Sequence, residues 1–216
     1  METFDERLHR YLNSRPVNIF GWMTVWAQNE LAPQVKLVTN PGAEVLLFVG
    51  CHTFIQGFME NTYGIRGKAA THEFLSRFMD GPNPHDQFSA VSSEIHDMRN
   101  VMAHQMYSAV THGIAFNYKL KRGWDHIGTD LHINPTIFGE QFVAALDGGR
   151  LRKWRNWASP ELLMRQKWRF IADWLDLKPK DPLRIAVETF AQLSTMQALT
   201  TAEATLREQF EAKFGV

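Results

Sequence analysis

Apolar residues between positions 88 and 106 recur at alternating spacings of three and four, and this pattern limits the chain to a largely helical fold. The members of this apolar stripe are Phe88, Val91, Ile95, Met98, Met102 and Met106. A repeat of that period places them on one side of an α-helix, which must be buried against other elements. We expect this helix to run from 84 to about 108, because Gly81-Pro82-Asn83-Pro84 interrupts the backbone just before it.

The rest of the chain also favours helices. Periodic apolar residues predict helices over 17–31, 42–61, 68–79, 134–146, 159–175 and 181–213. Pro33 acts as a stop for the first of them, and Ser159-Pro160 and Asp181-Pro182 are start signals for the last two. Between 114 and 133 an alternating pattern predicts a small β-hairpin insertion. The sequence therefore predicts a mainly α, single-domain protein with a helical core over 17–112, a hairpin over 113–133 and C-terminal helices over 134–214.

Composition and charge limit the partners and the cellular compartment that this chain can have. Lys plus Arg and Asp plus Glu both total 23, so no net charge attracts nucleic acid and any nucleic-acid surface must be local. The single cysteine, Cys51, excludes an internal disulfide framework. The first ten residues are rich in charge, and the most apolar run, 45–51, is far shorter than the roughly 18 residues of a membrane span. We expect a soluble protein of the cytoplasm, without a membrane partner.

The side of the helix opposite the apolar stripe gathers chemically active groups. Ser93, His96, Asp97, Asn100, His104 and Tyr107 fall within about 100° of one another on a helical wheel. Arg99 lies nearer the edge of the stripe, and its long side chain can reach toward this polar face. An ordinary solvated face, with Arg99 lying beside the core, is the simpler interpretation. Histidine, however, suits proton transfer near neutrality, and the arginine fork matches phosphate oxygens.

The segment Arg99-Asn100-Val101-Met102-Ala103-His104 resembles the motif of HEPN ribonucleases, in which a polar residue follows the Arg and a His stands four residues later. Ala103 is a frequent neighbour of that His, and the motif lies late on a helix, as it does in the family. The resemblance implies a HEPN-like helical bundle that pairs as a homodimer and brings two motifs to one cleft.

The implied reaction is metal-independent cleavage of RNA by attack of a ribose 2′-hydroxyl on the adjacent phosphate. His104 would transfer a proton, Arg99 would stabilise charge on the phosphate, and Asn100 would orient the phosphate or His104. A role as a toxin or defence effector, with an antitoxin or regulatory protein as partner, follows from the family alone. One departure concerns regulation: toxins of the family carry a Tyr two residues after the motif His, whereas this chain has Met106 there and Tyr107 one position later.

A second candidate surface is the segment 150–169, which contains seven basic residues and a single acidic one, with tryptophans between them. Such a segment can follow a phosphate backbone while bases stack on the rings, so Arg152, Lys153 and Arg155, together with Tyr107, are candidate RNA-binding residues. The alternative is a solvated basic face outside tryptophans that anchor the core. The histidines, including His52, form no recognised ligand spacing, so we expect no metal and no cofactor.

Two other functions remain open from the sequence. The chain could be a catalytically inactive HEPN-like module that binds RNA, a nucleotide or a protein through the same cleft. It could also be a helical adaptor unrelated to the family, with its last helix as the partner surface and Arg99 and His104 incidental. Activity measured with site variants separates the first function from these two.

Overall fold

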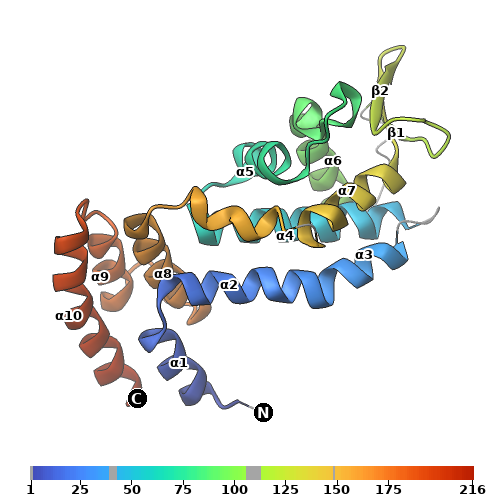
Figure 1. Cartoon of the computed structure of the whole chain (residues 1–216). Coiled ribbons are helices and arrows are strands. Elements are labelled where there is room, and N and C mark those ends of the chain that lie inside the picture. Colours follow the sequence, from blue (N-terminus) through green and yellow to red (C-terminus); the bar gives the residue numbers. More distant parts are fainter. Residues whose placement is uncertain (1, 39–42, 106–112, 148) are drawn as a thin grey trace. The chain divides into compact units, whose positions relative to one another are not determined.

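The computed structural model describes residues 2–38, 43–105, 113–147 and 149–216, and it is mainly α, which confirms the predicted fold class (Figure 1). The chain divides into two compact units. Unit 1 comprises Met1–Met23, Asn61–Gly64 and Arg155–Val216, and unit 2 comprises Thr24–Glu60 and Ile65–Trp154. The expectation that the whole chain acts as one domain stays a prediction.

The first half of the chain contains α1 (Phe4–Asn13), α2 (Pro16–Trp26), the π-helical turn η1 (Ala27–Leu31), α3 (Ala32–Val38), α4 (Glu44–Tyr63), α5 (Gly67–Phe74) and the π-helical turn η2 (Leu75–Met79). The second half contains the 3₁₀ turns η3 (Pro84–Asp86) and η4 (Phe88–Val91), α6 (Ser92–Gln105), β1 (Ile114–Phe116), β2 (Trp124–Ile127), β3 (Asp130–Ile133), α7 (Pro135–Asp147), the 3₁₀ segment η6 (Leu151–Asn156), α8 (Pro160–Trp174), α9 (Pro182–Phe190) and α10 (Met196–Phe214). Within the described ranges, no helix combines the length and apolarity needed to cross a bilayer.

Near the N-terminus the structure corrects two predictions. Helix α1 is not among the predicted helices, although its start signal is complete: Thr3 accepts a hydrogen bond from the backbone N–H of Glu6, and Glu6 accepts one from the backbone N–H of Thr3. Pro33 was wrongly expected to end the first predicted helix. The helical path continues through η1 into α3, and Pro33 falls in the first turn of α3, where its missing N–H does little harm.

The motif helix α6 begins later than predicted. Over 84–91 the chain forms η3 and η4, where the strand segment binds one backbone and one side-chain oxygen. The indole Nε1 of Trp124 donates to the carbonyl of Gln87, and the backbone N–H of Gly123 donates to Asp86 Oδ1 at 2.7 Å. The predicted apolar stripe is nevertheless confirmed, since its members from Phe88 to Met102 are all buried. Met106 lies outside the described residues.

The predicted β-element is present as a three-stranded sheet in the order β1-β3-β2. Strands β2 and β3 form an antiparallel hairpin whose two-residue turn uses Gly128 in the left-handed region, and β1 pairs with β3 in parallel, with Ile114 opposite Leu131. The expected alternation through Tyr118 does not form a strand. Asn117 ends β1 locally, because its side-chain oxygen accepts the backbone N–H of Lys119 and turns the chain.

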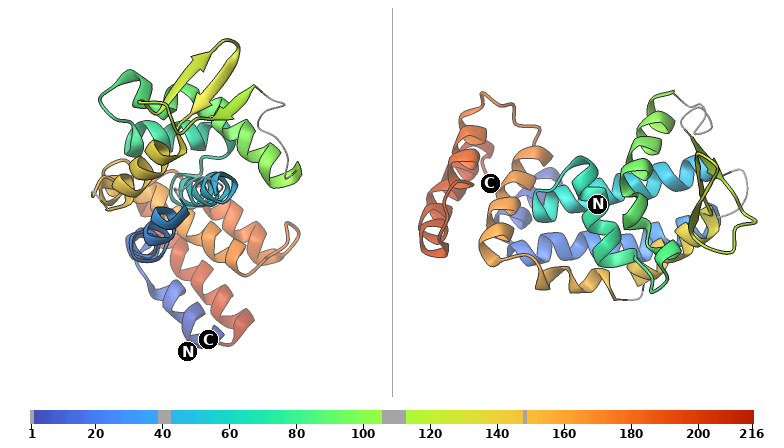
Figure 2. Two further views of the ribbon diagram at one scale, coloured as in Figure 1. Left: turned by 90° about the vertical axis from the view of Figure 1, so that its right-hand side faces the viewer. Right: turned by 90° about the horizontal axis from the view of Figure 1, so that it is seen from above.

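The helix predicted over 181–213 is two helices, α9 and α10. The chain leaves α9 after Phe190 and starts again at Thr195, whose hydroxyl accepts the backbone N–H of Ala198. The break lets both helices bury apolar residues in the same core as α8, and Figures 1 and 2 show the three helices as neighbours. The predicted caps Ser159 and Asp181 are confirmed at the starts of α8 and α9.

Each unit has its own core. Unit 2 is built around aromatic side chains of α4, α5 and α7, with the rings of Phe48 and Phe138 stacked at 4.5 Å and Phe58 edge-on to Phe74. In unit 1, Trp168 of α8 packs against Phe210 of α10. Within unit 2, α5 packs on α6, and this pairing positions the side chains described next.

Candidate functional site

The predicted catalytic residues all lie on α6 (Ser92–Gln105), which carries Arg99, Asn100 and His104. Of these three, the side chain of Arg99 is described, whereas for Asn100 and His104 only the helical backbone is. Tyr107, a candidate RNA-binding residue, lies outside the described residues. At about 1.5 Å of rise per residue, Arg99 and His104 are separated by about 7.5 Å along the helix axis.

The buried side of α6 fixes which way its polar side faces. Ile95, Met98 and Met102 are at most 5% exposed and form the apolar side predicted from the sequence. His96 lies about 60° around the wheel from Arg99, and Asn100 lies about 40° further on. His96 therefore occupies the strip between Arg99 and the rest of the predicted catalytic motif.

Three side chains from three helices meet next to this strip. His52 comes from α4, Thr71 from α5 and His96 from α6. Nε2 of His52 lies 3.0 Å from Nδ1 of His96. Oγ1 of Thr71 lies 3.2 Å from each of these two nitrogens. All three separations are hydrogen-bonding distances, so the atoms form a closed triangle.

Gln56 of α4 holds the threonine of this triangle in place. Its Oε1 accepts the backbone N–H of Gly67 at 2.9 Å, and its Nε2 donates to the carbonyl of Gly67 and to Oγ1 of Thr71, both at 3.0 Å. Because an N–H needs an acceptor, the bond from Gly67 fixes which end of the Gln56 amide is oxygen. Gly67 has a φ of +62°, a conformation that favours glycine at the start of α5. The hydroxyl of Thr71 therefore accepts one hydrogen from Gln56, and the carbonyl of Gly67, at 3.5 Å, is an acceptor for its own hydrogen.

Burial disfavours the charged form of both histidines. His52 is 2% exposed, and its pKa is lowered to about 3, first by burial and then by electrostatic interaction with His96 and with the charge of Arg99. Burial also lowers the pKa of the partly exposed His96, with Lys68 and Arg99 adding to the effect and Asp97 opposing it. The charge of Arg99 contributes to the lowered pKa of both imidazoles, whereas the expectation that its side chain reaches toward the polar face stays a prediction.

A surface ion pair borders the cluster. Nζ of Lys68 on α5 donates to Oγ of Ser93 at 2.9 Å and to Oδ2 of Asp97 at 2.6 Å, both on α6. The Lys68 and Asp97 side chains are both more than half exposed, so their pairing contributes little to stability. The charge of Lys68 is matched by Asp97. Arg99 is a second cation on this side of α6, near two imidazoles whose charged forms are disfavoured by burial, and such a set of groups suits a phosphate.

Residues that bind metals are not brought together in the described ranges, where no group of three or more His, Cys, Asp or Glu side chains could hold an ion. Cys51, next to His52, is completely buried, and burial raises the pKa of its thiol. The thiol is therefore protonated and shielded, which makes it a packing group.

Comparisons with known proteins find no matching family model, no related curated protein and no matching solved structure. The resemblance to HEPN ribonucleases thus depends on the motif residues and on the helix that carries them.

The structure divides the basic segment 150–169 into residues with internal partners and residues at the surface. Arg150 donates to the carbonyls of Phe78, Met79 and Asp80 at the end of η2. Lys167 is 1% exposed and donates to the carbonyl of Leu12 and to Glu203, and Arg169 pairs with Glu188.

The three predicted RNA-binding cations of this segment are exposed on η6. Arg152 also donates to Gln28 at 3.3 Å. Arg152 and Lys153 belong to unit 2, which contains α6, whereas Arg155 begins the last segment of unit 1. Among the tryptophans expected as core anchors, Trp168 is buried, but Trp157 is 43% exposed.

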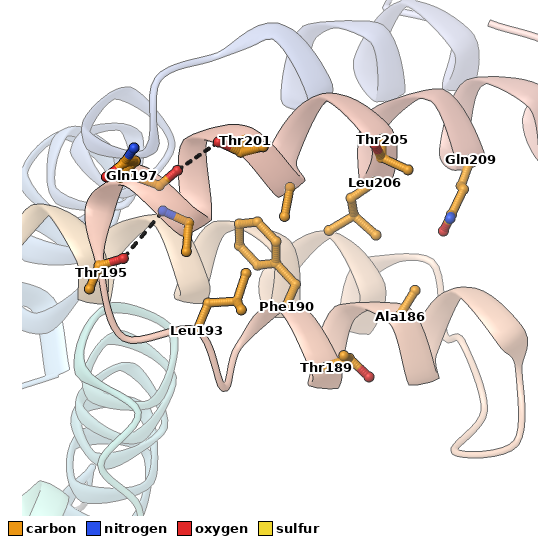
Figure 3. A pocket seen from close by; sticks show the side chains of 12 residues that line it. Ala186, Thr189, Phe190, Leu193, Thr195, Gln197, Thr201, Thr205, Leu206 and Gln209 are labelled. Carbon is orange, nitrogen blue, oxygen red and sulfur yellow. Dashed lines mark hydrogen bonds between the residues drawn. The ribbon is translucent and has the colours of Figure 1, made fainter.

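A groove of about 830 Å³ lies between α9 and α10 in unit 1, and none of the predicted site residues lines it (Figure 3). Phe190, Leu193 and Leu206 give it an apolar floor. Two of its hydroxyls bond within their own helices, Thr189 to the carbonyl of Ile185 and Thr201 to that of Gln197. The groove therefore offers mainly apolar contact.

The sequence pattern places His96 on the polar face without indicating a role for it, and His52 is only one of several scattered histidines. The residues of the triangle are 19 to 44 positions apart along the chain. No local spacing relates them, so packing of α4, α5 and α6 was needed to find the cluster.

Proposed function

We propose that the chain is a metal-independent endoribonuclease that uses Arg99, Asn100 and His104. The observation that carries the proposal is the placement of Arg99: it lies one turn from His96 on the helix that also carries His104, and Nδ1 of His96 lies 3.0 Å from Nε2 of the buried His52. A cation and neutral hydrogen-bonding groups side by side suit a phosphate diester, and the spacing to His104 matches the HEPN motif.

In the proposed reaction the ribose 2′-oxygen forms a bond to the adjacent phosphorus while the bond from phosphorus to the 5′-oxygen breaks. The proton of the 2′-hydroxyl passes to a general base, and the departing 5′-oxygen takes a proton. His104 takes part in this proton transfer, Arg99 stabilises the charge that develops on the phosphate, and Asn100 orients the phosphate or His104. The products end in a 2′,3′-cyclic phosphate and a 5′-hydroxyl. DNA lacks the attacking group and stays intact.

The test is incubation of the purified protein with mixed RNA in the presence of chelator. His104→Ala and Arg99→Ala should each slow cleavage by at least about a hundredfold, the usual cost of losing an acid-base group or a preorganised charge. His126→Ala, at an exposed histidine on β2, controls for removal of a histidine elsewhere. Undiminished cutting of RNA that carries a 2′-deoxyribose at the cut site, or strict dependence on added Mg²⁺, would contradict the mechanism.

The same resemblance extends the proposal to partners. The protein works in the cytoplasm as a homodimer whose interface includes α6, acts as a toxin or defence effector, and has an antitoxin or regulatory protein as partner. Light scattering tests the dimer, and a monomer with full ribonuclease activity would contradict it. Binding of RNA without cleavage would favour the catalytically inactive HEPN-like module.

The exposed cations of η6 form the proposed RNA-guiding surface. Reversing the charges of Arg152, Lys153 and Arg155 together should weaken RNA binding and reduce its salt dependence, because fewer phosphate contacts release fewer counterions. The fold should be retained, since all three side chains are exposed. Unchanged affinity and salt dependence would make these residues an ordinary solvated face.

A further inference from the structure

The hydrogens of the His52–Thr71–His96 triangle can be arranged in two ways while both imidazoles are neutral. In the first, Nε2 of His52 carries the hydrogen and donates it to Nδ1 of His96, which therefore carries its own hydrogen on Nε2. In the second, Nδ1 of His96 carries the hydrogen and donates it to Nε2 of His52, which then carries its hydrogen on Nδ1. Both arrangements satisfy the 3.0 Å contact between the rings.

The surroundings of His52 Nδ1 decide between the two arrangements. This atom is buried and has no hydrogen-bond partner in the part of the chain that the structure describes. The second arrangement would leave a buried N–H at Nδ1 without an acceptor. In native proteins a buried donor without an acceptor is rarer than a buried acceptor without a donor. The first arrangement leaves only the lone pair of His52 Nδ1 without a hydrogen-bond donor. Thr71 is consistent with it, because its hydroxyl oxygen accepts from Gln56, lies 3.2 Å from Nε2 of His52 and can donate its own hydrogen to the carbonyl of Gly67 at 3.5 Å.

The favoured arrangement fixes which ring nitrogen of the partly exposed His96 carries the hydrogen. With Nδ1 occupied as an acceptor, its hydrogen is on Nε2, across the ring from His52. Protonating His96 would place a second hydrogen on Nδ1, opposite the hydrogen that His52 donates. The charged groups around His96 are Lys68 on α5 and Asp97 and Arg99 on α6, while His52 is its neighbour on α4. His96 is thus held as a neutral N–H donor one helical turn from Arg99.

We propose, resting on the ribonuclease function proposed above, that His96 is a further residue of that site: His52 and Thr71 hold it with hydrogen on Nε2, and this N–H donates to an oxygen of the RNA phosphate that Arg99 binds. His96 and Arg99 are about 4.5 Å apart along α6, whereas His96 and His104 of one chain are about 12 Å apart. His96 therefore binds the phosphate held by Arg99 and does not exchange protons with His104. His52 is a positioning residue, acting through His96.

Two isosteric substitutions separate this role from a structural one. The amide of His96→Asn ends near the position of Nδ1, so it can accept the hydrogen of His52 but loses the donor at Nε2. The amide of His96→Gln reaches near the position of Nε2 and keeps that donor. Affinity is measured with a 2′-O-methyl oligonucleotide of mixed sequence, which cannot be cleaved by 2′-hydroxyl attack. His96→Asn should weaken binding about ten- to a hundredfold, the cost of a hydrogen bond to a charged group, and His96→Gln should retain affinity within about threefold.

Long-range ¹H–¹⁵N correlation spectra of the wild-type protein provide a second measurement that needs no variant at position 96. They should show Nδ1 of His96 without hydrogen and Nε2 with it, and His52→Phe should abolish that preference. Hydrogen on Nδ1 of His96, equal losses of affinity in the two variants, or a larger loss for His96→Gln would overturn the inference, as would a wild-type protein that does not bind the oligonucleotide. Failure of the proposed function is distinguishable, because binding with the expected order of variants but without cleavage of ordinary RNA leaves the role of His96 intact.

Discussion

Acidification should destabilise unit 2 through the buried His52. Its pKa in the folded protein is lowered to about 3, chiefly because the imidazole is buried. In the unfolded chain a histidine titrates at about 6.5. Between these values the unfolded state binds a proton that the folded state does not, so stability is fully present above about pH 6.5 and is lost as the pH falls toward 3.

The size of the loss at a chosen pH follows from these two values. At pH 5.0 the unfolded histidine is almost fully protonated and the folded one is almost fully neutral, so the free energy of unfolding falls by RT ln(1 + 10^1.5), or about 2 kcal/mol. Because pH 5.0 lies well above the folded pKa, this figure depends mainly on the unfolded value. His52 is 2% exposed, so solvent screening reduces the effect little.

Urea unfolding followed by circular dichroism at pH 7.5 and pH 5.0 measures the effect. The wild-type protein should lose about 2 kcal/mol more on acidification than His52→Gln, which cannot titrate and keeps a polar side chain there. Thr53→Ala, at the exposed neighbouring position on α4, should keep the wild-type response. His96 is present in all three chains, so its own contribution cancels to first order. Equal acid losses in wild type and His52→Gln would refute the reasoning.

Three further predictions concern packing. Lys167→Met should destabilise the protein by about 3 kcal/mol in thermal unfolding, because the side chain of Lys167 is 1% exposed and its ammonium donates to Glu203, which would lose its partner. Adding Glu203→Leu should recover part of that loss. An unchanged melting temperature in the single variant would contradict this prediction. Gly123→Ala should cost about 1–3 kcal/mol, since a Cβ there would lie 2.7 Å from the ring of Phe88, and unchanged urea stability would count against that close approach. Cys51 is completely buried, so an aromatic disulfide reagent should label it only when urea unfolds the chain, and rapid labelling in buffer would show that the site opens.

Several features of the fold were determined by local sequence. The spacing of Ile95, Met98 and Met102 fixes the buried side of α6, because helical geometry alone relates residues three and four apart. Ser159 and Asp181 determine helix starts in the same local way, since each side chain accepts a backbone N–H two or three residues later. The same local signals placed Arg99 and His104 on one helix.

Other helix boundaries depended on contacts that a local pattern does not contain. Pro33 does not end the helical path, because the π-helical turn before it shifts the backbone bonds so that its missing N–H falls in a first turn. The single helix expected over 181–213 divides in two, because α9 and α10 fold onto the same core. The 3₁₀ turns before α6 likewise form where the strand segment binds the backbone near Gln87.

The histidine cluster depended on tertiary structure most of all. His52, Thr71 and His96 each look like ordinary polar residues of separate helices, and their atoms come within about 3 Å only when those helices pack. Burial then lowers the pKa of both histidines, an effect that cannot be predicted from composition or from residue spacing. Sequence determines which side of a helix is polar, because that depends on residues one turn apart. Only the folded chain decides what faces that side, because desolvation and hydrogen bonding depend on groups brought from distant positions.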